Sequence, residues 1–196
     1  MSRNNTLLFQ GVSYALASGQ VLSVRGANGI GKSTLLRILA GFIEPQQGSV
    51  SYDNQVIFQD VAAYQHGIHY LGHDNGVRQY LTVYENLTFY AVLNDRVLST
   101  SQCNEVIQRV GLWAFRDTQA LCLSAGQLRR LSLAKLLLRP APFWILDEPT
   151  TALDDQGQQI LADLINQQLQ QNGMVVMATH QDIALTSKPN VLRLGS

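Results

Sequence analysis

Apolar and polar residues follow two periods along this chain, and the period changes from strand-like to helix-like and back. Alternating apolar residues in "QVLSVRG" (20–26) predict a strand, and "KSTLLRILAG" (32–41) predicts a helix that ends at its glycine. The polar stretch 45–58 follows, with a glycine and an Asp-Asn pair as turn signals, and it predicts a hairpin. A strand, a glycine-rich turn and a helix in this order form the first unit of an α/β fold.

The middle of the chain has mostly the helical period, and the strand pattern returns after Pro140. Helices are predicted at 82–93, 104–112, 126–139 and, rich in glutamine, 156–171; strands are predicted at 143–149 and 174–179. We therefore expect one α/β domain over residues 1–196, with a helical subdomain at approximately 76–140 inserted between its strands and a small antiparallel β region.

Composition narrows the class of protein. Fourteen Lys and Arg balance fourteen Asp and Glu among 196 residues, so no global positive field favours nucleic acid or an anionic membrane. Two cysteines outside a C-x-x-C pair suit a reducing compartment, with the cytoplasm as the default. The segment before "ALAS" (15–18) is too broken for a secretory signal, and charges and prolines interrupt the apolar stretch 131–146, so we expect no membrane span.

The first candidate site is "GANGIGKS" (26–33), which fits G-x-x-x-x-G-K-[ST] between the predicted strand and helix. Glycines let backbone N–H groups close on phosphates, Lys32 would reach the β- and γ-phosphate oxygens, and the Ser33 hydroxyl would ligate Mg²⁺. A plain glycine-rich turn would leave the lysine unexplained. The candidate nucleotide contacts are Gly26, Ala27, Asn28, Gly29, Ile30, Gly31, Lys32, Ser33 and Thr34.

"FWILDEP" (143–149) is a buried strand that ends in two acids. Asp147 would hold Mg²⁺ through water, and Glu148 is placed to orient or deprotonate an attacking water. The alternative is that both acids cap a helix that begins after the proline. The absence of an N-K-x-D motif argues against a GTPase, so we expect ATP.

"LSAGQLRR" (123–130) puts small residues at a helix start, which is a second place for an anion or, alternatively, a simple N-cap by Ser124. Together with "TALD" (151–154) and "ATHQ" (178–181), the ordered motifs resemble those of the ATP-binding subunits of ABC transporters over nearly the whole chain. The resemblance implies a P-loop NTPase, RecA-like core of ABC ATPase type.

The resemblance also implies an ATP-dependent head-to-tail homodimer. Each ATP would lie between one subunit's phosphate loop and the partner's signature segment, Ser124, Ala125, Gly126 and Gln127. Ser124 and Gly126 would touch the γ-phosphate, Asp154 would bridge the two sites, and His180 would sense the γ-phosphate beside Glu148.

Within that family, the short length, the stretch 69–90, the alanine of "LSAGQ" and "FWILDEP" resemble the subunits that serve bacterial c-type cytochrome maturation. This implies an integral membrane partner, a peripheral place on the cytoplasmic face of the inner membrane with membrane contact through that partner only, and a haem-handling step. The alternatives are a subunit of another small ABC transporter, a soluble ABC ATPase and a non-hydrolysing scaffold. The chain lacks the long coiled coil, zinc modules or tandem cassettes of the soluble enzymes, and Glu148 and His180 argue against a scaffold.

His73 is a departure from the family pattern, because a glutamine is usual nine residues before the threonine of "LTV" (81–83). A zinc site with His66 and His69 is disfavoured, since on one strand His66 would point away from the other two. Imidazole suits Mg²⁺ less well than an amide oxygen. We therefore expect His73 to bond the lytic water or the γ-phosphate and to couple hydrolysis to the membrane partner, with Asp74 as a substitute oxygen for the metal.

Two further departures concern the N-terminus and Ala125. Family members begin with a strand that carries an aromatic residue against adenine, whereas no clear aromatic precedes Phe9 here. We expect either a start farther upstream or a weakly held adenine. Ala125 stands where glycine is usual, so a left-handed backbone there becomes less favourable.

Overall fold

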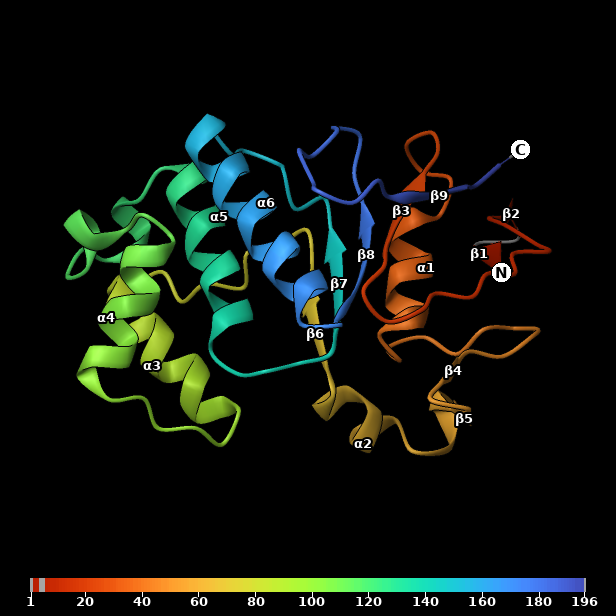
Figure 1. Cartoon of the computed structure of the whole chain (residues 1–196), viewed down its shortest axis with the longest axis horizontal. Helices are drawn as coiled ribbons and strands as arrows, with labels where there is room; N and C mark the ends of the chain where they lie inside the picture. Colours follow the sequence, from red (N-terminus) through yellow and green to blue (C-terminus); the bar gives the residue numbers. More distant parts are fainter. Residues whose placement is uncertain (1, 4–5, 196) are drawn as a thin grey trace. The chain divides into compact units, whose positions relative to one another are not determined.

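Five strands form the central sheet of the computed structural model, which describes residues 2–3 and 6–195 (Figure 1). Side by side, they are β6 (Ile68–Leu71), β7 (Phe143–Asp147), β8 (Met174–Ala178), β3 (Val21–Arg25) and β9 (Asn190–Arg193). The last four pair in parallel, so the predicted α/β class is confirmed. The predicted strands 20–26, 143–149 and 174–179 are β3, β7 and β8. Strand β9 was not predicted, because its side chains are only half-buried or exposed.

The chain divides into two compact units. The first comprises Met1–Tyr70, Ala141–Glu148 and Ile165–Ser196, and the second comprises Leu71–Pro140 and Pro149–Leu164. Helix α6 (Asp155–Gln170) runs from the second unit into the first and corresponds to the predicted helix 156–171. The placement of one domain over 1–196 with a subdomain at 76–140 stays a prediction.

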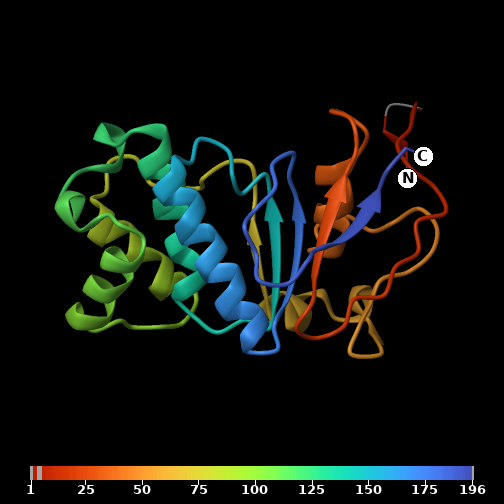
Figure 2. The ribbon, with the colours of Figure 1, turned by 45° about the horizontal axis from the view of Figure 1, so that its top comes forward.

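In the first unit, helix α1 (Lys32–Leu39) packs on one face of the sheet and contacts β7 and β8 (Figure 2). The core between them consists of fully or nearly fully buried aliphatic side chains, among them Val24, Leu36, Ile145 and Val176. Burial of these side chains fixes the carboxyl ends of the strands relative to the start of α1. That edge of the sheet carries the phosphate loop.

Smaller elements complete the first unit. Strands β4 (Ser51–Tyr52) and β5 (Gln55–Val56) form the predicted antiparallel hairpin, and both residues of its Asp53-Asn54 turn have positive φ, 49° and 61°. Such values suit a two-residue hairpin turn. The others are β1 (Ser2–Arg3) paired with β2 (Thr6–Leu7), the 3₁₀ turn η1 (Ile57–Gln59) and helix α2 (Val61–His66).

In the second unit, helices α3 (Val83–Leu93), α4 (Thr100–Arg109) and α5 (Ala125–Ala134) pack in sequence, α4 against both others. The 3₁₀ turns η2 (Trp113–Phe115) and η3 (Ala120–Cys122) lie between α4 and α5, and η4 (Lys135–Leu137) directly follows α5. Two predicted helices had wrong bounds, those at 104–112 and 126–139. Helix α4 begins at Thr100 rather than at 104, because Ser99 and Gln102 form a capping box, and α5 tightens into η4 before 139.

Over the described residues, none of the helices combines the length and the apolar character needed to cross a membrane.

Candidate functional site

The phosphate loop begins at the end of β3 and closes on the first turn of α1. Its three glycines have φ values of 157°, 79° and 109°, which side-chain-bearing residues rarely adopt. Gly31 is the N-cap of α1, and a Cβ added there would lie 2.9 Å from Phe9 Cδ1 and 3.2 Å from Leu8 Cβ. Only glycine therefore fits under the Phe9 ring. The loop is exposed at Ala27, Asn28 and Gly29, while Thr34 is half-buried in the helix.

Lys32 is almost completely buried, and its ammonium group turns back across this loop. Nζ donates hydrogen bonds to Gly26 O at 2.9 Å and to Ala27 O at 3.2 Å, and it lies 3.1 Å from His180 Nε2. A cation at the start of a helix, where backbone N–H groups are without intrahelical partners, attracts phosphate through charge-assisted hydrogen bonds. The loop is therefore built to receive an anion.

Two oxygen-bearing side chains meet next to the lysine. The Ser33 hydroxyl donates to Asp147 Oδ1 at 3.1 Å, and Asp147 ends strand β7 with only 2 % of its surface exposed. Hydroxyl and carboxylate oxygens are the ligands that Mg²⁺ prefers, usually together with water and substrate phosphates. The pair thus fits a magnesium ion between the protein and a nucleotide.

Glu148 follows Asp147 in a strained backbone conformation. Its φ is 47°, and its backbone N–H donates to Ala178 O at 2.8 Å, which fixes the bend at the end of the strand. Left-handed glutamate costs energy and is a mark of functional sites. Its carboxylate Oε1 lies 3.6 Å from His180 Nε2. At this separation no water fits between the acid and the imidazole, but both can contact one water or phosphate oxygen that lies to one side of them.

The signature segment lies in the second unit and starts α5. Ser124 Oγ accepts from Gln127 N at 3.2 Å, and Gln127 Oε1 accepts from Ser124 N at 2.8 Å, so both side chains form a capping box. A Cβ added to Gly126 would lie 2.8 Å from Ala152 O. Ala125 occupies the first helical turn without a positive φ, so the methyl group brings no backbone strain.

Asp154 lies in the same unit and caps α6. Its Oδ1 accepts from Gly157 N at 2.9 Å, and its backbone carbonyl accepts from Gln158 N at 2.8 Å. Capping fixes the carboxylate at the helix start, where the helix dipole favours negative charge.

His73 is exposed in the bend that follows β6. The reasoning that put three histidines on one strand was wrong. His69 lies in β6, but His66 ends helix α2, where its Nδ1 is 2.7 Å from Ala62 O. Within the part of the chain that the structure describes, no group of three or more His, Cys, Asp or Glu could hold a metal ion.

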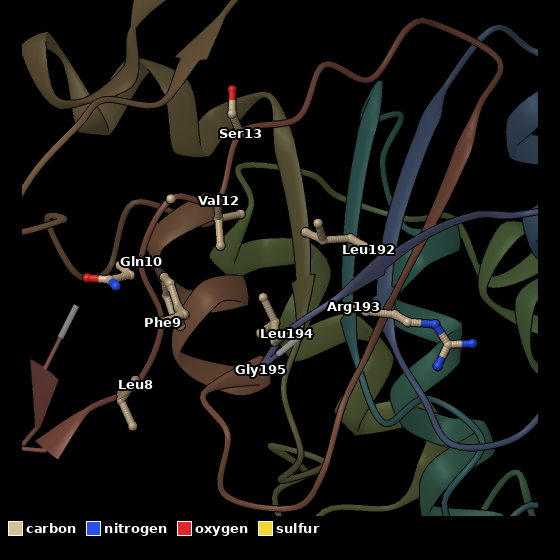
Figure 3. A pocket seen from close by; sticks show the side chains of 10 residues that line it. Leu8, Phe9, Gln10, Val12, Ser13, Leu192, Arg193, Leu194 and Gly195 are labelled. Carbon is tan, nitrogen blue, oxygen red and sulfur yellow. The ribbon is translucent and has the colours of Figure 1, made fainter.

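A pocket of about 340 Å³ lies in the first unit, between segment 8–13 and segment 192–195 (Figure 3). Leu8 and Phe9 belong to its lining and also pack on Gly31, and Gly195 packs against Ile30. The pocket therefore adjoins the phosphate loop. Sequence reasoning did not find it, although Phe9 was the one aromatic residue noted near the N-terminus.

Sequence reasoning also missed the contacts of two cations of the signature helix region, one buried and one half-buried. Arg129 is 2 % exposed, and Lys135 is half-buried at the start of η4. Both bond to the segment Gly72–Gly76, which carries His73. The signal was present as cations within the apolar pattern of 126–139, where a charge needs a partner.

Comparison with known proteins agrees with this geometry. The sequence profile described as "ABC transporter" matches residues 9–151. The chain belongs to the ABC transporter family. Among curated proteins, "Cytochrome c biogenesis ATP-binding export protein CcmA" of Yersinia pestis bv. Antiqua (strain Nepal516) is 43 % identical over 185 residues, 94 % of this chain and 84 % of the relative.

Two solved structures resemble the fold of this ABC protein. A putative ABC transporter ATP-binding protein from Pyrococcus furiosus has a TM-score of 0.83 at 23 % identity, over 98 % of this chain and 92 % of its own. A dimeric ATP-binding cassette, in a post-hydrolysis state with ADP and Pi, has a TM-score of 0.75 at 25 % identity, over 89 % and 80 %.

Family membership assigns the general activity. The chain is an ATP-binding, ATP-hydrolysing subunit of ABC type, and its relatives imply dimerisation and a membrane partner.

Proposed function

We propose that this ATPase is the CcmA-type subunit of a complex that matures c-type cytochromes. The supporting observation is the relative from Yersinia pestis, because identity of 43 % extends over 94 % of this chain rather than over the ATP-binding motifs alone. ATP hydrolysis then drives a haem-handling or export step in the membrane complex.

In this proposal the first unit binds the nucleotide and carries out hydrolysis. Residues 26–34 bind the phosphates, with the Lys32 ammonium on the β- and γ-phosphates. Ser33 and Asp147 hold Mg²⁺, which neutralises charge that develops on the transferred phosphoryl group. Glu148 orients the attacking water and accepts its proton, and His180 donates a hydrogen bond to the γ-phosphate.

The pocket beside the phosphate loop supplies an apolar surface for adenine. Phe9 and Leu8 line it and touch Gly31, so a base bound there would remain within reach of a triphosphate on the loop. Phe9→Ala should weaken ATP binding severalfold and leave inorganic phosphate binding unchanged. Equal ATP affinity in both proteins, measured by calorimetry, would exclude this place for the base.

The second unit completes the site of a partner copy. In a head-to-tail homodimer, Ser124, Ala125, Gly126 and Gln127 bind the γ-phosphate held by the partner's loop, and Asp154 bridges the two sites. The capped start of α5 supports this role, because helix N-termini bind anions. His73, exposed in its bend, couples this cycle to the membrane partner.

The proposed partner is an integral membrane subunit of CcmB type, with CcmC, CcmD and CcmE as further members of the assembly and no nucleic acid. The ATPase would lie on the cytoplasmic face of the bacterial inner membrane as a peripheral protein that contacts the membrane through its partner only. An even balance of charges gives no independent attraction to anionic lipid.

Purification from native membranes tests this assignment. A mild detergent extract is fractionated by affinity to a tag on this subunit, and the retained proteins are identified by mass spectrometry with and without ATP. Retention of a haem-binding membrane partner set supports the proposal. Retention of a permease for sugars, metals or drugs instead would assign the chain to another small ABC transporter.

A further inference from the structure

A pair of cations, Arg129 on α5 and Lys135 at the start of η4, bonds the loop segment Gly72–Gly76 from one side. We propose that this pair, the two-cation clamp, holds the loop that carries His73 in register with the signature helix. Both cations would then be positioning residues for ATP hydrolysis. The inference rests on the proposed role of the loop, but its structural part can be tested without activity.

Arg129 makes the deeper half of the clamp. Nη1 donates to Gly72 O at 3.1 Å and to Asn75 Oδ1 at 3.3 Å, and Nε donates to Pro149 O at 3.3 Å. The Arg129 guanidinium thus connects Gly72 and Asn75 of the loop to Pro149. Pro149 directly follows Glu148 in the chain. The donors of a guanidinium lie in a fixed fork, so a shift of α5 moves both acceptors together.

Lys135 makes the outer half, six residues later in the chain. Nζ donates to Asn75 O at 2.6 Å and to Gly76 O at 2.8 Å, and it lies 3.9 Å from the centre of the Tyr90 ring. Gly76 has a φ of 57°, and a Cβ added there would lie 3.2 Å from Nζ. The loop therefore ends in a left-handed glycine that lets the two carbonyls converge on one ammonium.

The clamp engages mainly the backbone of the loop, and Asn75 is the one side chain to which these bonds go. Its acceptors are carbonyl groups and the Asn75 amide, while His73 and Asp74 remain exposed between them. A cation aimed at convergent carbonyls fixes a loop without engaging its functional side chains. The exposed side chains thus move with α5 and remain free to meet a nucleotide or a partner.

A spin label at Asp74→Cys, in a Cys122→Ser background, reports loop mobility directly, because the other cysteine, Cys103, is buried. Lys135→Met should at least double the mobile spectral fraction, Lys135→Arg should restore the original spectrum, and Lys188→Met, at an exposed lysine, should change nothing. Arg129→Gln is a second variant if Lys135→Met folds poorly. Identical spectra for all these variants would overturn the clamp.

Kinetics of the same substitutions in the otherwise native chain separate positioning from nucleotide binding. For Lys135→Met we expect a severalfold loss of kcat with the KM for ATP unchanged, and rescue by Lys135→Arg. An equal loss of kcat in Lys135→Met and Lys135→Arg, or a change that affects only the KM for ATP, contradicts a positioning role. If no variant hydrolyses ATP but the spectra behave as expected, the proposed function fails and the clamp stands.

Discussion

The Ser33 hydroxyl donates a hydrogen bond to the buried Asp147 carboxylate across 3.1 Å, and this contact joins the start of α1 to the end of β7. Both oxygens suit Mg²⁺. Ser33→Ala should raise the Mg²⁺ concentration for half-maximal ATPase activity by about tenfold, because one oxygen ligand and its orienting bond are lost. A Mg²⁺ titration of phosphate release measures this, with Ser33→Thr as the matched control. An unchanged requirement in Ser33→Ala would remove the serine from the metal site.

Gly126 faces Ala152 O, and a Cβ at Gly126 would approach that oxygen to 2.8 Å. Gly126→Ala should therefore destabilise the second unit by about 1–3 kcal/mol, as overpacking does, and abolish ATP-dependent dimerisation. Thermal unfolding and size-exclusion chromatography with ATP measure the two effects. Ala125→Gly, one residue away and free of that contact, is the control. A Gly126→Ala protein that unfolds and dimerises like the parent would exclude tight packing here.

His73 stands exposed in the bend that follows β6, and its proposed role is to couple hydrolysis to the membrane partner. His73→Gln should alter the stimulation of ATP hydrolysis by the membrane partner across pH 6 to 8, because an amide neither titrates nor bonds like an imidazole. Hydrolysis rates with and without the partner, reconstituted in lipid, provide the measurement. If both rates and the stimulation persist in His73→Gln, the coupling role is wrong.

Lys135 makes the clamp sensitive to pH. Burial, and then the Arg129 charge, lower the pKa of Lys135 from 10.5 to about 8. A loop that opens exposes the amine to water, so the open form binds the proton more tightly than the closed form. Raising the pH from 7 to 9 should therefore favour the closed loop, by up to about tenfold.

The spin label at position 74 measures this as a mobile fraction that falls with pH. The amine also lies over the ring of Tyr90, and burial raises the pKa of Tyr90 although the nearby Arg78 charge opposes this. The Tyr90→Phe substitution tests whether the Tyr90 phenol contributes to the pH dependence of the mobile fraction. In Lys135→Arg the charge persists at both pH values, so the trend should vanish. A mobile fraction that rises with pH in the native chain would contradict the sign.

The nucleotide motifs could be predicted because their chemistry lies in short, continuous stretches. The spacing from Gly26 to Ser33 determines both the loop and the helix start, and the apolar run before Asp147 determines its burial. Contacts between distant stretches could not be predicted in this way. The bonds from Arg129 to Gly72 and from Lys135 to Asn75 depend on how helices pack, and helical periodicity predicts only which residues are apolar.

Local errors had local causes. His66 was assigned to a strand because no start signal was weighed at Asp60, whose carboxylate accepts from Ala63 N and begins α2. Helix α4 began four residues earlier than predicted because Ser99 and Gln102 cap it. Both capping signals, at Asp60 and at Ser99 with Gln102, can be recognised in the sequence. The left-handed Glu148 is different, since its φ follows from the β8 backbone that accepts its N–H.

The measurement that most directly tests the whole account is single-site substitution of Glu148, the residue assigned to the attacking water. With MgATP, the native protein should release phosphate, whereas Glu148→Gln should lose at least about a hundredfold in rate, since general-base catalysis contributes at least that much. The variant should still bind ATP and accumulate as a dimer on size-exclusion chromatography. A Glu148→Gln protein that hydrolyses ATP at the native rate, or that binds ATP only as a monomer, would contradict the account.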